Sequence, residues 1–211
     1  GAKTNVTKPT FSWKAWTIGW CSTFSNYEIQ ICSDNGCSSV TQSKTDATTT
    51  SWTLSTALAQ WTYYWRVREK DSLGRYSEWT SVRSLIVDTK APSVSADKSS
   101  SSWYTSDISI TLSVSDSGWA GLEYGKYKWD DSSCTNGTTF SNGSKIKWST
   151  EWTHVLYLCA KDNAWNTKTW SWTYKLDKAN PVITVTDAST TCAASKTVTS
   201  RSERASCRER V

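Results

Sequence analysis

Several residue types are scarce in this chain or missing from it. Its 211 residues include no methionine, one histidine, three prolines and nine glycines, so glycine makes up roughly 4% of the chain where about 7% is usual. Leu, Ile, Val and Phe together number only 32, which excludes a helical bundle with an aliphatic core. No apolar run reaches the roughly 18 residues that indicate a membrane-spanning helix, and no signal peptide opens the chain.

Aromatic and hydroxyl side chains are abundant instead. The chain has 15 Trp, 9 Tyr and 3 Phe, and Ser and Thr together number 66. A core built from aromatic and alternating β-branched residues is typical of β-sheets, so we predict an all-β secreted or surface protein. The net charge of +5 does not predict a nucleic-acid partner, because four of the eight Arg lie in residues 201–211. Without this tail, which holds four Arg and two Glu, the net charge is +3.

A sequence repeat divides the chain into tandem domains. Asp88 is followed four residues later by Pro92, Asp177 is followed four residues later by Pro181, and the two prolines are 89 residues apart. A repeat of this length is too long for a solenoid unit and suits a β-sandwich. We predict one sandwich at residues 1–88, a second at 89–177, and the start of a truncated third at 178–200.

Short strand-like runs recur along the first predicted domain, at residues 27–31, 51–54, 64–68 and 81–87. Their alternation of apolar and polar residues places one face of each strand in a core. Residues 58–67 read LAQWTYYWRV and residues 71–77 read DSLGRYS, and this stretch resembles the late strands of fibronectin type III domains. The resemblance implies that Tyr64 is the corner tyrosine, whose hydroxyl ties the start of a strand to the preceding loop. Trp61 departs from the family, which has Gly there.

Two runs in the second predicted domain carry a different resemblance. Residues 108–116 read ISITLSVSD, and residues 151–166 end in Asp-Asn-Ala-Trp-Asn. These runs resemble the bacterial immunoglobulin-like repeats of large surface proteins, which normally have Ala-Gly-Asn in the last turn. The resemblance implies tandem immunoglobulin-like or fibronectin type III-like β-sandwiches and indicates no ligand, because a fold does not determine a function.

Several Trp residues stand where a turn normally requires glycine. Trp165 lies in a turn between strand-like runs, where a residue that tolerates positive φ is expected. Trp61, Trp152 and Trp172 lie in a similar context, next to a strand. We interpret these four as UGA codons translated as Trp, from a bacterium that reads UGA as glycine. Weaker candidates are Trp16, Trp20 and Trp119, and we interpret Trp65, Trp79 and Trp129 as genuine. The alternative is a Trp-rich binding protein.

The composition changes abruptly at residues 201–211, which read RSERASCRERV. Residues 204–211 can be back-translated into a sequence that resembles a common short-read sequencing adapter, so we interpret this tail as an artefact. The alternative is a genuine basic tail. Because no Met opens the chain, we expect it to be a fragment of a longer gene.

The spacing of the cysteines predicts two disulfides. Cys32 and Cys37 flank an Asn-Gly pair, a strong hairpin signal, and opposed hairpin positions can approach within disulfide range. Cys134 and Cys159 are the only two cysteines of the second domain. Three cysteines remain without an assigned partner: Cys21, Cys192 and Cys207. A single histidine and the lack of a Cys-x-x-Cys pair do not indicate zinc.

The sequence carries no catalytic signature. No Gly-x-Ser-x-Gly or His-Glu-x-x-His motif occurs, and the single histidine, His154, lies in a strand-like run. Asp130 and Asp131 are adjacent, so on a strand their carboxylates would point to opposite faces, which suits a loop better than an acid–base pair. We therefore predict no catalytic residues and no enzymatic activity.

Oxygen-bearing side chains recur near the predicted domain ends, where ligands from two modules could hold calcium and stiffen the joint. They are Asp88, Asp97, Asp116, Asp162, Asn163 and Asp177. No EF-hand loop is present, and Asp and Asn also form turns without any metal. We expect no other cofactor, and both interpretations of these residues stay open.

These observations favour a non-catalytic stalk of tandem sandwiches in a bacterial cell-surface or secreted protein, carrying an adhesive or catalytic domain outside this chain. Short joints that contain Pro limit bending, and disulfides resist unfolding outside the cell. The expected partners are neighbouring domains of the same chain, together with a cell-surface protein or glycan. Two alternatives stay open: a carbohydrate-binding module that stacks sugars on exposed Trp rings, and an accessory region of a secreted hydrolase.

Overall fold

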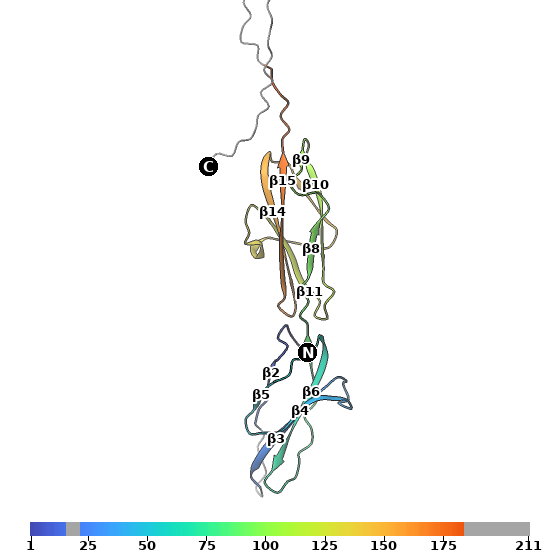
Figure 1. Ribbon diagram of the computed structural model, residues 1–211, viewed down its shortest axis with the longest axis vertical. Coiled ribbons are helices and arrows are strands. Elements are labelled where there is room, and N and C mark those ends of the chain that lie inside the picture. Colours follow the sequence, from blue (N-terminus) through green and yellow to red (C-terminus); the bar gives the residue numbers. More distant parts are fainter. Residues whose placement is uncertain (16–21, 184–211) are drawn as a thin grey trace, which may run out of the picture.

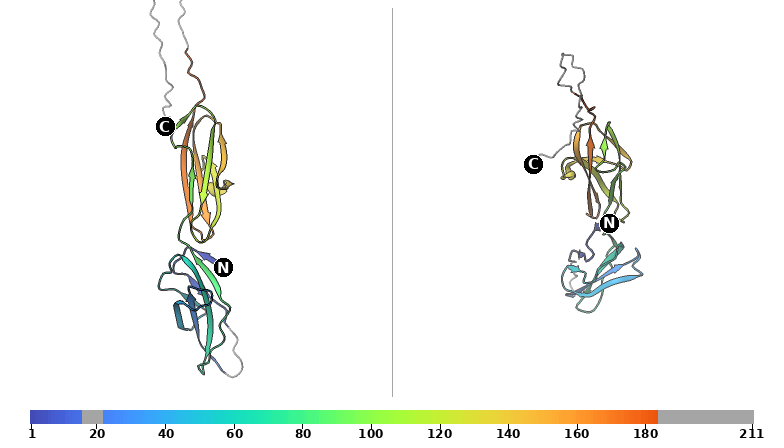
Figure 2. Two further views of the ribbon diagram at one scale, coloured as in Figure 1. Left: turned by 90° about the vertical axis from the view of Figure 1, so that its right-hand side faces the viewer. Right: turned by 45° about the horizontal axis from the view of Figure 1, so that its top comes forward.

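The computed structural model describes residues 1–15 and 22–183. These residues form two β-sandwiches that lie end to end along the long axis of the molecule (Figure 1, Figure 2). Apart from one 3-10 turn, η1 at Cys134–Asn136, the described residues contain no helix, which confirms the predicted all-β fold. No helix in the described ranges is therefore long and apolar enough to cross a membrane.

Several sequence predictions fall outside the described residues. They concern Trp16, Trp20, Cys21, Cys192 and Cys207, most of the predicted third sandwich, and the tail at 201–211.

The first sandwich consists of a five-stranded and a two-stranded sheet. Its strands are β1 (Ala2–Thr4), β2 (Thr10–Ser12), β3 (Phe24–Cys32), β4 (Val40–Ala47), β5 (Ser51–Thr53), β6 (Trp61–Asp71) and β7 (Arg83–Val87). The larger sheet has the order β1-β7-β6-β3-β4, and the smaller pairs β2 with β5. Buried side chains from both sheets, such as Phe11 of β2 and Ile29 of β3, meet in one core.

Strand β6 shows how alternation positions the side chains. Tyr63 and Val67 point into the core, whereas Tyr64 lies on the opposite face of the strand and is only partly buried. Within the described ranges, the Tyr64 hydroxyl forms no hydrogen bond. The corner bond that the family resemblance implied for Tyr64 is therefore not formed, because a one-residue shift moves a side chain to the other face of the sheet.

The second sandwich pairs a three-stranded with a five-stranded sheet. Its strands are β8 (Ser93–Ala96), β9 (Trp103–Tyr104), β10 (Ile108–Ser115), β11 (Leu122–Trp129), β12 (Thr138–Phe140), β13 (Ser144–Trp148), β14 (Trp152–Asp162) and β15 (Thr167–Leu176). The sheet orders are β13-β10-β8 and β12-β11-β14-β15-β9. Leu112, Leu156, Leu158 and Tyr174 are fully buried in the core between the sheets.

Both predicted disulfides are present, one in each sandwich. Cys32 at the end of β3 is bonded to Cys37, with the two Cα atoms 5.1 Å apart. Cys134 in η1 is bonded to Cys159 in β14, with a Cα separation of 5.8 Å. The second disulfide ties η1 to the central strand of the larger sheet.

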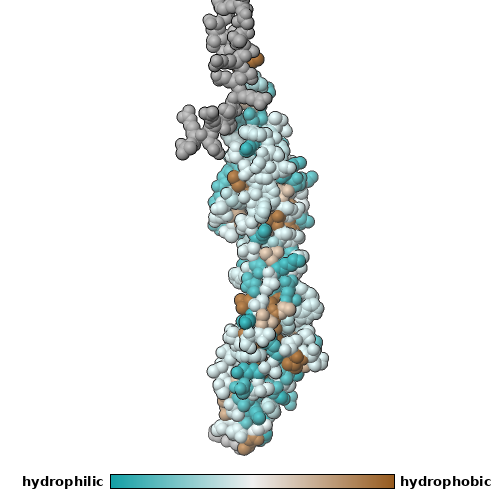
Figure 3. Space-filling view, in the orientation of Figure 1, coloured by the Kyte–Doolittle hydropathy of each residue, from teal (hydrophilic) through white to brown (hydrophobic). Residues whose placement is uncertain are grey.

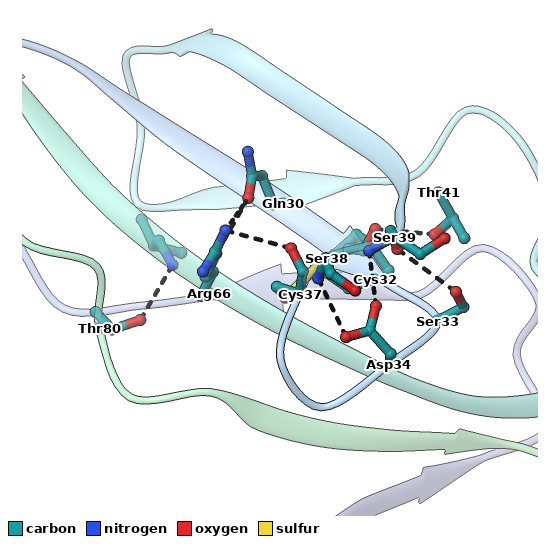
Figure 4. Close-up of a disulfide and its surroundings, with 12 residues drawn as sticks. Gln30, Cys32, Ser33, Asp34, Cys37, Ser38, Ser39, Thr41, Arg66 and Thr80 are labelled. Atoms are coloured by element: carbon teal, nitrogen blue, oxygen red, sulfur yellow. Dashed lines mark hydrogen bonds between the residues drawn. A yellow bond between two sulfur atoms is a disulfide. The ribbon is translucent and has the colours of Figure 1, made fainter.

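The loop that the first disulfide closes is wider than a two-residue hairpin turn. The Asp34 carboxylate accepts hydrogen bonds from the backbone N–H groups of Ser38 and Ser39, at 3.1 and 2.7 Å (Figure 4). These bonds lower the pKa of Asp34. A two-residue Asn-Gly hairpin turn would have a left-handed backbone at Asn35 and Gly36. Here the left-handed residue is Cys37, with φ 52°.

The two sandwiches end in the same way. In the first, β1 runs parallel to β7, and the backbone N–H of Asp88 bonds the carbonyl of Thr4 at 2.9 Å. In the second, β9 runs parallel to β15, and the N–H of Asp177 bonds the carbonyl of Tyr104 at 3.0 Å. Each Asp carboxylate also accepts a 3.0 Å hydrogen bond from the N–H two residues later. The sequence repeat is thus also a repeat of local structure.

Candidate functional site

A polar site lies at the joint between the two sandwiches. The end of β7 meets two loops of the second sandwich, residues 116–121 after β10 and the turn at residues 163–166 after β14. The Nζ of Lys3 donates a 2.6 Å hydrogen bond to the carbonyl of Ala120. The rings of Trp61 and Trp119 also contact each other across the joint, with centroids 4.6 Å apart and planes inclined by 54°. The visible surface is continuous from one sandwich to the other (Figure 3).

Asp88 is the residue of the first sandwich that enters this site. It is 0% exposed, and its Oδ2 accepts a 2.7 Å hydrogen bond from the N–H of Ala120. Its backbone carbonyl accepts a 2.7 Å bond from the side-chain amide of Asn166. Gly118 passes so close that a Cβ at this position would collide with the Asp88 carboxylate. The sequence of the loop therefore leaves room for the carboxylate.

Asp162 holds the turn after β14 together. It is also 0% exposed, and its Oδ1 accepts bonds from the N–H groups of Ala164 and Asn166, at 2.9 and 2.8 Å. Its Oδ2 accepts a 2.7 Å bond from the side-chain amide of Asn166. Because that same amide bonds the carbonyl of Asp88, Asn166 links the two buried acids.

Asp116 completes the site from the end of β10. Its Oδ1 accepts a 2.9 Å hydrogen bond from the N–H of Gly118. Its Oδ2 is inaccessible to solvent and has no hydrogen-bond partner among the described residues. A buried carboxylate oxygen without a partner is uncommon, since buried polar atoms are nearly always hydrogen-bonded.

The three carboxylates form one cluster. One oxygen from each of Asp88, Asp116 and Asp162 lies within 4.8 Å of the others. Within residues 1–15 and 22–183, no Lys, Arg or His side chain forms an ion pair with any of the three; the ion pairs there involve other acids. Carboxylate oxygens are the ligands that Ca²⁺ and Mg²⁺ prefer. The donor set therefore fits a hard divalent cation.

The other three residues of the calcium expectation lie elsewhere or bond differently. Asp97 follows β8 and therefore lies one strand length away from the joint. Its carboxylate accepts a 2.7 Å hydrogen bond from the N–H of Thr111. Asn163 lies beside the site, but its amide donates to the carbonyl of Gly121 at 2.7 Å. Asp177 lies at the far end of the second sandwich. Sequence reasoning thus named the three clustered acids without separating them from these three.

The turn at Asp162 has a counterpart in the first sandwich. Asp71 at the end of β6 accepts bonds on Oδ1 from the N–H groups of the residues two and four positions later, at 3.0 and 2.9 Å, as Asp162 does. Counting the Asp as the first residue of each turn, the fourth residue is Gly74 in the first sandwich, with φ 81°, and Trp165 in the second, with φ 78°. The same turn therefore carries glycine in one sandwich and Trp in the other.

The four Trp residues interpreted as glycines have different backbones. Trp152 and Trp165 have φ values of 86° and 78°, in the left-handed region, and each is 68% exposed. Neither Trp61 nor Trp172 has a positive φ. Trp172 is partly buried and packs against the second core. The backbone supports the glycine hypothesis at positions 152 and 165 and gives no reason for glycine at 61 and 172.

The Trp residues interpreted as genuine pack against defined partners. Trp79 lies under the guanidinium groups of Arg66 and Arg68, each 4.4 Å from its ring centroid. The rings of Trp129 and Trp148 are 4.1 Å apart in the second sandwich. In the first sandwich, the ring centroids of Trp65 and Phe11 are 5.3 Å apart.

The geometry at His154 does not resemble a catalytic pair. Its Nδ1 lies 2.6 Å from the Asp130 carboxylate and its Nε2 lies 3.1 Å from the carbonyl of Glu151. Both ring nitrogens therefore face acceptors, and neither is directed at a serine or threonine hydroxyl. The Asp130 carboxylate also accepts a bond from the N–H of Val155, which makes this pair a brace between β11 and β14.

Comparisons with known proteins give distant likenesses only. A scan against protein-family models found no match, and a search of the curated proteins found none. Among solved structures, the chain is similar to the fibronectin(III)-like modules of CbhA from Clostridium thermocellum, with 18% identity, 83% of this chain and 90% of that chain covered, and a TM-score of 0.44. It is also similar to the central fibronectin-III array of RIM-binding protein, with 11% identity, coverages of 86% and 71%, and a TM-score of 0.29. The assignment of the fold therefore rests on the strands and sheets described above.

Proposed function

We propose that this chain is a non-catalytic spacer, a stalk segment of a bacterial cell-surface or secreted protein in which β-sandwiches follow one another end to end. The observation that carries the proposal is the repeated end of the two sandwiches. Asp88 and Asp177 have the same backbone bonds and the same distance to a following Pro. A repeated unit with a repeated joint makes an array whose length grows with the number of units.

The contacts across the first joint support a stiff spacer. Only residues 88–92 separate the last strand of one sandwich from the first strand of the next, and Pro92 restricts this linker. A lysine–carbonyl bond, a carboxylate–amide bond and a pair of packed Trp rings cross the joint. They join β1, β6 and the end of β7 to the single loop at residues 116–121 of the second sandwich, so three points of the first sandwich hold this loop in place.

An extracellular location is favoured by the disulfides and the surface. Disulfides form and persist in oxidising compartments, and each sandwich has one. The visible face of the molecule is mostly of intermediate hydropathy, with hydrophilic groups spread over it and small separate apolar patches (Figure 3). Such a surface keeps an extended array soluble without specifying a partner.

The proposal is tested by measuring how the two sandwiches tumble. In a stiff spacer, backbone ¹⁵N relaxation of the full chain gives both sandwiches one common, strongly anisotropic rotational diffusion. Lys3→Ala removes the lysine–carbonyl bond and is expected to loosen the joint, whereas Lys145→Ala, on the exposed face of β13, is the matched control. Two independent, nearly isotropic correlation times in the unaltered chain would refute the stiff spacer.

A carbohydrate-binding module is the second candidate, and exposed aromatic rings favour it. Trp103, Trp119 and Trp170 are about half exposed, and sugars stack on such rings. Lysine ammonium groups lie over Trp103 and Trp170, at 5.5 and 5.2 Å from the ring centroids. Retardation of the chain in gels containing soluble polysaccharides, abolished by Trp170→Ala, would favour this function over the spacer. A catalytic domain beside this segment in the full gene would make it an accessory region of a hydrolase.

A further inference from the structure

We propose that the joint binds a divalent cation of the calcium type through Asp88, Asp116 and Asp162, and that the ion locks the two sandwiches together. Binding does not depend on the spacer function, whereas the consequence for stiffness rests on it. Asp88 comes from the end of the first sandwich, whereas Asp116, just after β10, and Asp162, the last residue of β14, belong to the second. An ion held by all three therefore bridges the joint.

The negative charge of the cluster calls for a cation. Three carboxylates have oxygens within 4.8 Å of one another, and two of them are fully buried. Buried charges in proteins are paired with an opposite charge or coordinate a metal. No cationic side chain in the described ranges pairs with them, so a bound cation is the remaining source of opposite charge.

The equivalent turn of the first sandwich shows what compensation by a side chain looks like. There, the Asp71 carboxylate is paired with the Arg75 guanidinium at 2.7 Å. At the joint, the position of Arg75 is taken by Asn166, whose amide is neutral and bonds Asp162 and the carbonyl of Asp88. The turn at the joint thus keeps the carboxylate and lacks the internal cation.

The unpartnered oxygen of Asp116 points to a ligand independently of the charge. Its Oδ2 is shielded from solvent and accepts no hydrogen bond from the described residues, although its Oδ1 is bonded to Gly118. An acceptor without a donor leaves its desolvation uncompensated. A metal ion supplies the missing interaction at that atom.

The chemistry of the donors selects the ion. The oxygens lie within 4.8 Å of one another, close enough for one ion with metal–oxygen bonds of about 2.0–2.6 Å to contact all three. All three donors are carboxylates, and neither imidazole nor thiolate contributes, which disfavours zinc. Calcium accepts six to eight oxygens in an irregular arrangement, whereas magnesium requires a near-octahedral shell and retains several waters. A packed joint with three acids suits calcium better.

The experiment measures binding directly on the full chain. After removal of metal with a chelator, the chain is titrated with CaCl₂ and, separately, MgCl₂ by calorimetry, to about 10 mM, well above the ~10⁻⁴–10⁻³ M dissociation constants of extracellular calcium modules. Asp116→Asn removes one charge at a partly exposed position, where a folding defect is least expected. Asp46→Asn is the matched control, because this acid is on the first sandwich and its side chain is 80% exposed.

We expect one calcium ion per chain and at least about tenfold weaker affinity for magnesium. Asp116→Asn should bind calcium at least about tenfold more weakly than the unaltered chain, whereas Asp46→Asn should bind it with unchanged affinity. Terbium luminescence sensitised by Trp provides a second readout, and calcium should displace the terbium in the unaltered chain. Absence of calcium uptake, or equal uptake by both variants, would overturn the site. If calcium is not taken up and the sandwiches still tumble as one body, this inference fails while the spacer proposal stands.

Discussion

Exchanging the fourth residue between the two equivalent Asp turns is expected to move the stability of the two sandwiches in opposite directions. The second sandwich has Trp165 at φ 78° where the first has Gly74 at φ 81°. Glycine adopts such a backbone freely, whereas a residue with a bulky side chain is strained there by about 1–3 kcal/mol. The perturbation is therefore the pair Trp165→Gly and Gly74→Trp.

The magnitude follows from what each side chain touches. Trp165 is 68% exposed, and its ring contacts the ammonium of Lys161 at 3.7 Å, an interaction that contributes about 0.5–1 kcal/mol at an exposed site. Glycine also lowers stability by about 0.4–1 kcal/mol through the greater freedom of the unfolded chain. With central values, Trp165→Gly stabilises the second sandwich by about 0.5 kcal/mol. Gly74→Trp destabilises the first by about 1 kcal/mol, since a Cβ there meets no atom closer than 4.0 Å and only the backbone strain remains.

Urea unfolding of each variant, followed by near-ultraviolet circular dichroism, measures both changes. Trp170→Gly is the matched control in the second sandwich, because this Trp is similarly exposed but lies inside β15 without a positive φ. It is expected to lose about 0.5–1 kcal/mol, the ordinary cost of glycine within a strand. A loss above about 1 kcal/mol in Trp165→Gly would refute the strain argument and indicate that this indole has a role of its own.

Three further predictions concern other parts of the chain. Trp172→Gly is expected to destabilise the second sandwich by about 2–3 kcal/mol, because the Trp172 ring packs against the core. The loss is smaller than the ~3–5 kcal/mol expected for a fully buried aromatic, because this ring is only partly buried. A glycine variant that shows no such loss would contradict this packing. Replacing both Cys134 and Cys159 with Ala opens a bridge across 25 residues and is expected to lose about 3–4 kcal/mol in urea unfolding, with no loss arguing against the bond. The pKa of Asp71 is held at about 2 by a hydrogen bond from the backbone of Arg75. Because this folded-state pKa is below the unfolded value of 3.8, the ionised Asp71 carboxylate stabilises the fold above pH 3.8, and this stabilisation disappears as the pH falls toward 2. The urea midpoints of the unaltered chain and of Asp71→Asn should therefore approach each other over that pH range.

Much of the fold could be predicted because alternation is a local property. Residues 27–31 were predicted to form a strand, and they lie within β3, with Tyr27, Ile29 and Ile31 buried. Each of these side chains faces the core because successive residues point to opposite faces. The family resemblance indicated a role for Tyr64 but not which of the two adjacent tyrosines faces the core, and in β6 it is Tyr63 that is buried there.

The site was less predictable because it depends on strand direction. Asp97 is close to a domain boundary in the sequence, but β8 carries it along the sandwich and away from the joint. Asp162 is far from that boundary in the sequence, and the turn between β14 and β15 returns it to the joint. Proximity along the chain therefore does not predict which acids meet. The contact between the Trp61 and Trp119 rings had no signal in the sequence, because it arises only when the two sandwiches are docked.

The contrast between Asp88 and Asp177 shows what makes a joint. Both residues have the same backbone bonds, yet Asp88 is 0% exposed and Asp177 is exposed. The difference in burial must then come from the loops of the second sandwich, which supply the N–H of Ala120 and the amide of Asn166 to Asp88. The first sandwich thus presents an Asp, and the facing end of the second presents the donors and acids that cover it. The two facing ends are unlike and complementary, so the contact is head-to-tail, as the proposed spacer requires.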